Sequence, residues 1–275
     1  MRLVIHGGCH KTASTAFQNI ARAGEARLAG RGVIYPPFEG RVQHSQLVWR
    51  WQDGDRAALA RVLREAVAKG GETILLSGED FENALVDLAF AQEVEAVARD
   101  AGVTGIDWLF VTRAPRDYVL SVYAELSRHN VVTDLNVIAA NARERGCFSV
   151  STFHLSQIFV FDVARFAERM RGAVEGSVEV MEMETFTAGF PGRVLLSRLA
   201  GEEVADAIFA EAPEGRGRNA RMSELEVESR YAQSALGLWR GEGGALRRLA
   251  AGVLVGALAR WRLARVRRQT AKLEV

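Results

Sequence analysis

The stretch that decides the fold lies at the start of the chain, where residues 3–18 read LVIHGGCHKTASTAFQ. The apolar residues Leu3 to Ile5 predict a strand, and a helical pattern starts at Ser14. Two glycines, a lysine and hydroxyl side chains lie at the junction. Such a turn lets the backbone approach an anion, and the first N–H groups of the helix point at it along the helix dipole. The sequence therefore predicts a phosphate or sulfate site, to which Lys11 adds a positive charge.

The turn does not match the Walker A loop of nucleoside triphosphatases and kinases. That motif has glycine immediately before the lysine and another glycine five residues further back, where this chain has His10 and Ile5. Such enzymes also need a carboxylate that holds Mg²⁺, and no apolar strand-like segment ends in a suitable Asp. A P-loop kinase is therefore the least favoured function that we consider.

The turn instead resembles the 5′-phosphosulfate loop of sulfotransferases that use 3′-phosphoadenosine 5′-phosphosulfate (PAPS), and especially that of their bacterial branch. The family pattern is His-x-Gly-x-His-Lys-Thr-x-[Ser/Thr]-Thr-x-x-Gln, and the chain matches it at His6, Gly8, His10, Lys11, Thr12, Ser14, Thr15 and Gln18. The resemblance implies PAPS as co-substrate. Many relatives carry glycine where this chain has Ala13, and alanine costs little there if its φ angle is negative.

A second motif strengthens this resemblance. Residues 106–112 read as a buried strand and run directly into RAPRDYVLSVY (residues 113–123), in which Pro115 suits the first turn of a helix. A guanidinium at a strand end and a hydroxyl two helical turns later can converge on one phosphate. Arg-x-Pro-x-Asp-x-x-x-Ser-x-Tyr resembles the 3′-phosphate motif of the same enzymes, which implies that Arg113 and Ser121 bind the 3′-phosphate. Open parallel sheets bind ligands beyond the carboxyl ends of their strands, so the two motifs predict one site.

Strands and helices alternate along the chain, which predicts an α/β fold with three layers, a mostly parallel central sheet, a P-loop-like phosphosulfate loop and a helical C-terminal extension. We expect residues 1–212 to form the core and residues 213–275 to complete the same domain. Further strands are expected at 33–35, 73–77 and 178–182. Helices are expected from 14 to near 30, from after the Pro36-Pro37 turn to 67, and at 87–101, 115–130, 134–145 and 163–171. Everything after about residue 188 is expected to be helical.

The resemblance assigns roles within the loop. In sulfuryl transfer, negative charge grows on the bridging oxygen of the departing bisphosphate, and a lysine near that oxygen neutralises it. Lys11 is expected to be this catalytic residue, with His10 touching the sulfonate and His6 supporting the turn. The cradle for the 5′-phosphate and sulfonate is expected from Thr12, Ala13, Ser14 and Thr15.

Two residues compete for the role of general base toward the acceptor hydroxyl. His44 follows the Pro36-Pro37 turn, where related enzymes often place a histidine, and an imidazole titrates near neutrality. Glu79 follows a predicted strand and resembles the Ser-x-Glu segment of some bacterial and glycan sulfotransferases. We rank His44 first and Glu79 second. The alternative interpretations are a surface or capping histidine and a charge at a helix N-terminus.

Two later segments each have two interpretations. The loop around Arg218 carries glycines and arginines before a helix, and it predicts either a basic loop over the nucleotide or a linker. Residues 246–272 combine apolar residues at helical spacing with many arginines. They predict either a helix docked on the core by an apolar stripe, which we favour, or a helix that binds a membrane surface or an acidic partner. The apolar residues concerned are Leu246, Leu249, Val253, Leu254, Leu258 and Trp261.

Composition limits the remaining possibilities. The formal net charge is +1, which does not indicate nucleic-acid binding, and Cys9 and Cys147 are too few for a disulfide framework. No metal site is expected, because His6 and His10 lack a third ligand. Without a signal peptide or an apolar run long enough for a membrane span, the expected compartment is the cytoplasm. The expected acceptor is a carbohydrate or small-molecule hydroxyl; the alternative function is a non-catalytic nucleotide- or glycan-binding protein on the same fold.

Overall fold

The computed structural model describes residues 1–152, 156–212, 222–237, 245–271 and 273, and side chains between 238 and 251 lie outside the description. The chain forms two compact units: residues 1–113 with 157–218, and residues 114–156 with 219–275. Each unit is described by itself. The expected division of the chain at residue 212 stays a prediction.

The first unit is built on a five-stranded sheet in the order β2-β3-β1-β4-β7, and every neighbouring pair is parallel. The strands of this sheet are β1 (Arg2–His6), β2 (Val33–Ile34), β3 (Thr73–Ser77), β4 (Gly105–Thr112) and β7 (Ser177–Glu182). The chain leaves β1 toward one edge of the sheet and later returns past it to β4. The carboxyl ends of β3, β1 and β4 therefore lie side by side at the position where ligands bind in such sheets.

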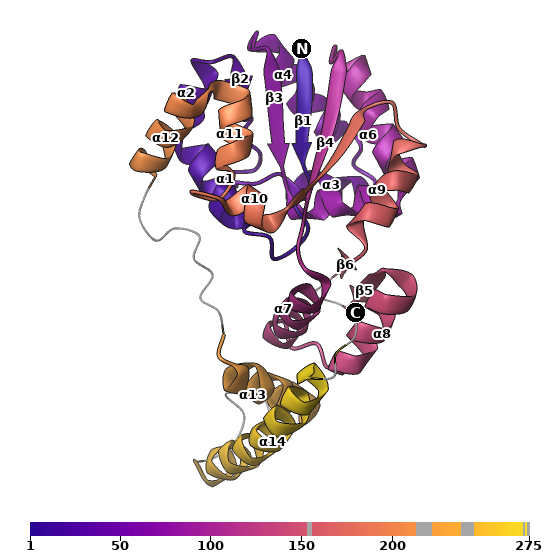
Figure 1. Cartoon of the computed structure of the whole chain (residues 1–275), viewed down its shortest axis with the longest axis vertical. Coiled ribbons are helices and arrows are strands. Elements are labelled where there is room, and N and C mark those ends of the chain that lie inside the picture. Colours follow the sequence, from indigo (N-terminus) through magenta and orange to yellow (C-terminus); the bar gives the residue numbers. More distant parts are fainter. Residues whose placement is uncertain (153–155, 213–221, 238–244, 272, 274–275) are drawn as a thin grey trace. The chain divides into compact units, whose positions relative to one another are not determined.

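Helices cover both faces of this sheet, so the expected α/β class is confirmed. They are α1 (Ser14–Ala23), α2 (Glu25–Ala29), α3 (Ser45–Gln52), α4 (Ala57–Ala68), the 3₁₀ helix η1 (Glu79–Glu82), α5 (Asn83–Val86), α6 (Leu88–Asp100), α9 (Val163–Arg171), α10 (Met183–Thr187), α11 (Arg193–Ala200) and α12 (Glu202–Glu211). Figure 1 shows α11 and α12, in orange, to the left of β3, β1 and β4.

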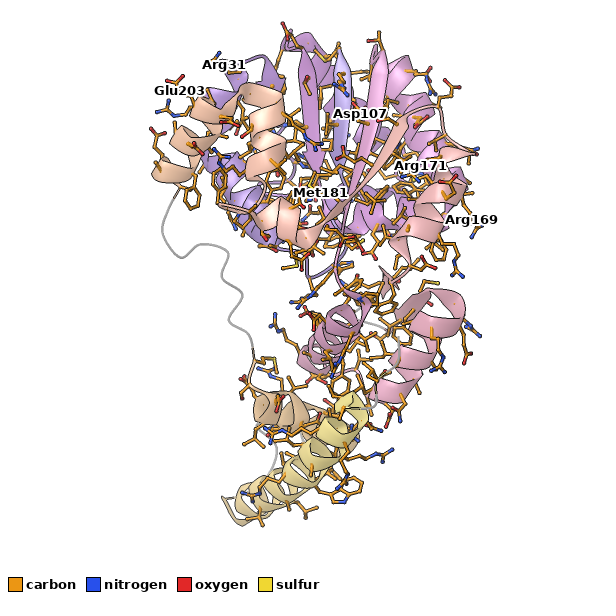
Figure 2. The ribbon with its side chains drawn as sticks, in the orientation of Figure 1. Arg31, Asp107, Arg169, Arg171, Met181 and Glu203 are labelled. Atoms are coloured by element: carbon orange, nitrogen blue, oxygen red, sulfur yellow. The ribbon has the colours of Figure 1, made fainter. Side chains whose placement is uncertain are left out.

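Alternate residues of the strands face the two helical layers, as the period of a β-strand requires. On one face, Val4 and Leu109 belong to a cluster with Phe17 of α1 and Leu196 of α11. Met181, labelled in Figure 2, extends this cluster onto β7. On the other face, Trp108 donates a hydrogen bond from Nε1 to Glu95 of α6 at 3.0 Å.

The second unit is mainly helical. It contains α7 (Pro115–Arg128), α8 (Leu135–Arg145), α13 (Glu224–Ala235) and α14 (Ala245–Ala271), with the strand β5 (Cys147–Ser151). A further strand, β6 (Ser156–Val160), belongs to the first unit from Gln157 onward. Neither β5 nor β6 was expected from the sequence.

A buried polar cluster joins three helices of the second unit. Tyr123 of α7 donates a hydrogen bond from its hydroxyl to Glu228 of α13 at 2.7 Å, and Arg262 of α14 pairs with the same carboxylate at 2.9 Å. The Arg262 guanidinium also lies over the ring of Tyr231, 3.4 Å from its centroid. This cluster gives α14 a fixed rotation about its own axis.

Candidate functional site

The loop between β1 and α1 is shaped by close packing around its glycines. A Cβ atom on Gly7 would lie 2.8 Å from Phe110, and one on Gly8 would lie 2.5 Å from the Ser14 hydroxyl and 2.8 Å from His6 Nε2. Such distances are far shorter than van der Waals contact allows. Both positions therefore require glycine, as expected where a backbone must pass close to other groups.

Backbone hydrogen bonds hold the loop against the neighbouring strand ends. The Gly7 N–H donates to Leu109 at 2.9 Å, and the Cys9 N–H donates to Val111 at 3.3 Å, so the loop continues the pairing of β1 with β4. On the β3 side, the His10 N–H donates to the Glu82 carboxylate at 3.0 Å. The loop is thus fastened on both flanks before α1 begins.

The turn into α1 uses a left-handed backbone at two residues that are not glycine. The φ angle is +69° at Lys11 and +66° at Ala13. The condition under which alanine costs little, a negative φ angle, is therefore not met at Ala13, and this expectation is corrected. A residue with a Cβ atom is strained in this region, which explains why glycine suits the position. Between the two, the Thr12 hydroxyl donates to the Cys9 carbonyl at 2.5 Å.

The N-terminus of α1 has the properties of an anion site. The first N–H groups of a helix have no acceptor within the helix, and the N-cap residue Ala13 offers no side-chain cap. Ser14 is buried there, and Thr15 is half-buried. The structure thus places Lys11, Thr12, Ser14 and Thr15 in one strand-loop-helix, the local form that the sequence predicts.

His6 supports this loop and leaves one nitrogen without a partner. Its Nδ1 lies 2.8 Å from the hydroxyl of Ser77, and its ring stacks on Phe186. Burial lowers the pKa of His6 to about 3, so the ring is neutral. Its buried Nε2 has no hydrogen-bond partner among the described residues, and it borders the close approach at Gly8. An unpaired polar atom beside an uncapped helix N-terminus is a second indication that a ligand binds here.

His10 is paired with Glu79, a contact that was not expected. Its Nδ1 lies 3.3 Å from Glu79 Oε2. Burial by itself lowers the pKa of His10, but the hydrogen bond and charge of Glu79, with the charges of Glu82 and Asp80, outweigh burial and raise it to about 9. His10 is therefore an imidazolium at neutral pH, and its positive charge lies beside the loop.

Two of the acidic residues that follow β3 have partners for their carboxylates. The Glu82 carboxylate accepts the backbone N–H groups of His10 and Val160. Glu79 faces the His10 imidazolium, and its side chain is the more exposed of the two. Glu79 therefore lies at the rim of the site with a carboxylate that a second molecule can reach.

His44, the first choice as general base, is fully buried and hydrogen bonded at both ring nitrogens. Its Nδ1 accepts the Ser77 N–H at 3.0 Å, and its Nε2 lies 2.7 Å from the carbonyl of Pro36. Burial lowers its pKa to about 4. In this structure His44 joins the Pro36 turn to the end of β3, and it offers no free nitrogen to an acceptor. This environment suits a structural role.

The second motif lies partly in each unit. Arg113, directly after β4, donates from Nη1 to the Lys11 carbonyl at 3.3 Å, so it contacts the loop between β1 and α1 within the first unit. Ser121 lies on α7 in the second unit, and its convergence with Arg113 stays a prediction. Arg218, the residue expected in a basic loop, lies outside the described residues.

The environment of Cys9 and the possibility of a metal site remain to be described. Cys9 is fully buried, and burial, reinforced by Glu82, raises the pKa of its thiol. A protonated, buried thiol is a poor nucleophile, which favours a packing role. Among the described residues, no group of three or more His, Cys, Asp or Glu side chains is arranged to hold a metal ion.

Comparison with known proteins leaves the family open. No protein-family model matches the chain, and the search of curated proteins also returned no match. The geometry of the loop and the resemblance of its residues to the sulfotransferase pattern therefore remain as the indications of function.

Proposed function

We propose that this protein is a sulfotransferase of P-loop-like architecture that transfers a sulfuryl group from PAPS to a hydroxyl of a carbohydrate or small molecule. The observation that carries the proposal is the hydrogen bond from Arg113 to the Lys11 carbonyl. It brings the arginine of the 3′-phosphate-like motif to the phosphosulfate-like loop, although 102 positions separate them in the sequence.

The residues of the loop fit a sulfated and phosphorylated ligand. The uncapped start of α1 supplies N–H donors, and Lys11 supplies a cation beside them. The unpaired His6 Nε2 and the close approach at Gly8 belong to the same loop. PAPS would supply the sulfuryl group, whose bond to the bisphosphate oxygen breaks as a bond to the acceptor oxygen forms.

Lys11 and Glu79 then carry the chemistry contributed by the chain. Lys11 neutralises the negative charge that develops on the departing bisphosphate, and a preorganised cation of this kind typically contributes a few kcal/mol. Glu79 accepts the proton of the acceptor hydroxyl, and the His10 imidazolium beside it holds the carboxylate in position. Cationic side chains and the N–H dipoles at the start of α1 thus compensate the negative charge of PAPS.

The first experiment is a calorimetric titration of the full chain with 3′,5′-adenosine bisphosphate, followed by ATP with Mg²⁺. We expect the bisphosphate to bind and Mg-ATP to bind much more weakly. A preference for Mg-ATP would support a kinase instead. If neither ligand binds, the proposed PAPS site is wrong.

Arginine variants test the 3′-phosphate assignment with a matched control. Arg113→Ala should weaken binding of 3′,5′-adenosine bisphosphate by tenfold or more, because a charged hydrogen-bond donor contributes roughly 1.5–3 kcal/mol, and it should change adenosine 5′-phosphate binding little. Arg116→Ala, three residues further on, should bind both nucleotides like the parent protein. Equal losses for both nucleotides in Arg113→Ala would show that this arginine does not recognise the 3′-phosphate.

Turnover separates an enzyme from a binding protein on the same fold. Lys11→Ala should retain the fold, checked by circular dichroism, and lose at least a hundredfold in kcat in an acceptor screen with PAPS. A bisphosphate-binding protein that sulfates none of the carbohydrate or phenolic acceptors would favour the non-catalytic alternative. Near-normal kcat in Lys11→Ala would remove this lysine from the mechanism.

A further inference from the structure

Among the described side chains of α14, three residues are buried against its own unit. They are Val255, Ala259 and Arg262, of which Arg262 forms the buried ion pair with Glu228. These positions recur every three to four residues, so they form one stripe along the helix. Leu258, Leu263 and Val266 are half-buried on or beside this stripe.

Three large apolar residues of α14 point away from this stripe. Val253, Leu254 and Trp261 are 68%, 57% and 57% exposed. At 100° per residue they fall within an arc of about 100°, on the side of the helix opposite Val255 and Arg262. The expectation that α14 docks through its apolar stripe is therefore wrong for these three residues, and an exposed apolar strip of this kind indicates an interaction surface.

Arginines border the exposed strip. Arg260 and Arg265 lie on its two edges, and Arg268 continues it by two turns toward the C-terminus. Arg265 pairs with Asp134 at 3.5 Å, whereas Arg260 and Arg268 make no ion pair within the described part of the chain. The strip, defined by Val253, Leu254, Ala257, Arg260, Trp261 and Arg268, therefore combines apolar area with uncompensated positive charge.

This combination matches the chemistry of an anionic lipid surface. Helices that lie in a membrane interface bury aliphatic and tryptophan side chains at the boundary between headgroups and acyl chains, and their arginines extend to the headgroups. No helix within the described residues is both long and apolar enough to cross a membrane. A second copy of the chain fits less well, because pairing two strips would bury the Arg260 and Arg268 of each copy, and residues 245–271 contain no carboxylate to pair with them.

We propose that the exposed strip of α14 binds the surface of anionic membranes, with Leu254 and Trp261 inserted and Arg260 and Arg268 at the headgroups. None of the residues of this strip is assigned to the proposed sulfotransferase site. Each can therefore fail without the other.

The test is sedimentation of the full chain with vesicles of phosphatidylcholine alone or with about a third phosphatidylglycerol, at low and high salt. We expect binding to the anionic vesicles, little binding to the neutral ones, and a weaker affinity at high salt. Leu254→Gln/Trp261→Gln should lose binding by tenfold or more. Arg260→Gln and Arg268→Gln should each weaken it about fivefold on anionic vesicles.

A matched control uses an exposed valine of the same unit. Val137→Gln on α8 alters a side chain that is 48% exposed, and it should bind vesicles like the parent protein. Circular dichroism verifies that each variant is folded. Absence of binding to anionic vesicles at low salt would overturn the proposal, as would equal losses in Val137→Gln. A dimer in sedimentation velocity that Leu254→Gln/Trp261→Gln converts to monomer would show that a second copy covers the strip.

Discussion

Ala13, like Lys11, is a residue at which the loop between β1 and α1 carries backbone strain. Its φ angle of +66° lies in the left-handed region, where a Cβ atom costs roughly 1–2 kcal/mol and glycine costs almost nothing. Ala13→Gly should therefore raise the free energy of unfolding by about 0.5–1 kcal/mol, since part of the gain is offset by the greater freedom of glycine in the unfolded chain. Urea unfolding measures this difference.

A second alanine nearby provides the control. Ala16 lies within α1, where glycine is unfavourable, so Ala16→Gly should lower the free energy of unfolding by about 0.5–1 kcal/mol. Opposite signs in the two variants support left-handed strain at residue 13. If Ala13→Gly destabilises as much as Ala16→Gly, the loop does not hold residue 13 in this conformation.

The pairing of His10 with Glu79 gives a prediction of its own. Because Glu79 contributes both a hydrogen bond and a charge to His10, Glu79→Gln should lower the pKa of His10 from about 9 toward its ordinary value. NMR titration of the imidazole resonances measures this change. Asp87→Asn, which removes the N-cap carboxylate of α6, should leave the His10 titration unchanged. A His10 titration that is the same in Glu79→Gln and the parent protein would contradict the pair.

At the scale of elements, the rotation of α14 depends on one buried ion pair. The side chains of Arg262 and Glu228 are 8% and 1% exposed, so water cannot compensate for the loss of either partner. Arg262→Met should lower the stability of the second unit by about 3–5 kcal/mol, because it leaves the Glu228 carboxylate buried without its cation. Thermal unfolding followed by the near-ultraviolet signal of tyrosine measures the loss.

The double variant separates lost packing from an unpaired charge. Arg262→Met/Glu228→Met removes both charges and should recover much of the lost stability, since paired replacement by apolar residues is often close to neutral. An exposed ion pair provides the comparison. The side chains of Arg267 and Glu224 are both 66% exposed, so Arg267→Met should lower the free energy of unfolding by less than about 1 kcal/mol. Similar losses in Arg262→Met and Arg267→Met would contradict the importance of burial.

Other elements show which parts of the fold can be predicted from the sequence. The apolar run at β3 and the amphipathic pattern of α9 predict both elements with the bounds that the structure has, because burial on one or two faces determines their composition. The expected single helix from residue 14 to near 30 is interrupted at Gly24, where a Cβ atom would lie 2.4 Å from Ile208. That contact comes from α12, far along the chain, and no local pattern contains it.

In the candidate site, too, some features follow from the local sequence and others from residues that are distant in the sequence. The strand, turn and helix around Lys11 follow from a local pattern and are confirmed. The role of His44 depends on Pro36 and on the end of β3, which only the folded chain brings to its two nitrogens. The contact of His10 with Glu79 depends on β1 lying beside β3. A signal was available, since both residues lie in the turns that follow predicted strands, but the order of the strands in the sheet was needed to use it.

At the scale of the whole molecule, the stability of the fold depends on pH through three buried histidines. Two of them have a lowered pKa and one has a raised pKa, so they act in opposite directions. An unfolded histidine titrates near 6.5. His6 and His44 have folded pKa values of about 3 and 4, so between pH 4 and 6.5 the unfolded chain binds protons that the folded chain does not. Stability therefore rises with pH over this window. His10 has a folded pKa of about 9, so its contribution is fully present below pH 6.5 and is lost as pH rises toward 9.

The free energy of unfolding of the first unit should therefore pass through a maximum near pH 6.5. Each fully titrating histidine contributes a slope of at most about 1.4 kcal/mol per pH unit, positive on the acid side and negative on the alkaline side. Urea unfolding at intervals from pH 4 to 9 measures the curve. In His10→Gln the alkaline decline should flatten while the acid limb keeps its slope, because His6 and His44 are unchanged. An alkaline limb that stays as steep in His10→Gln would mean that another group causes the decline, and that the imidazolium beside the anion loop does not stabilise the fold.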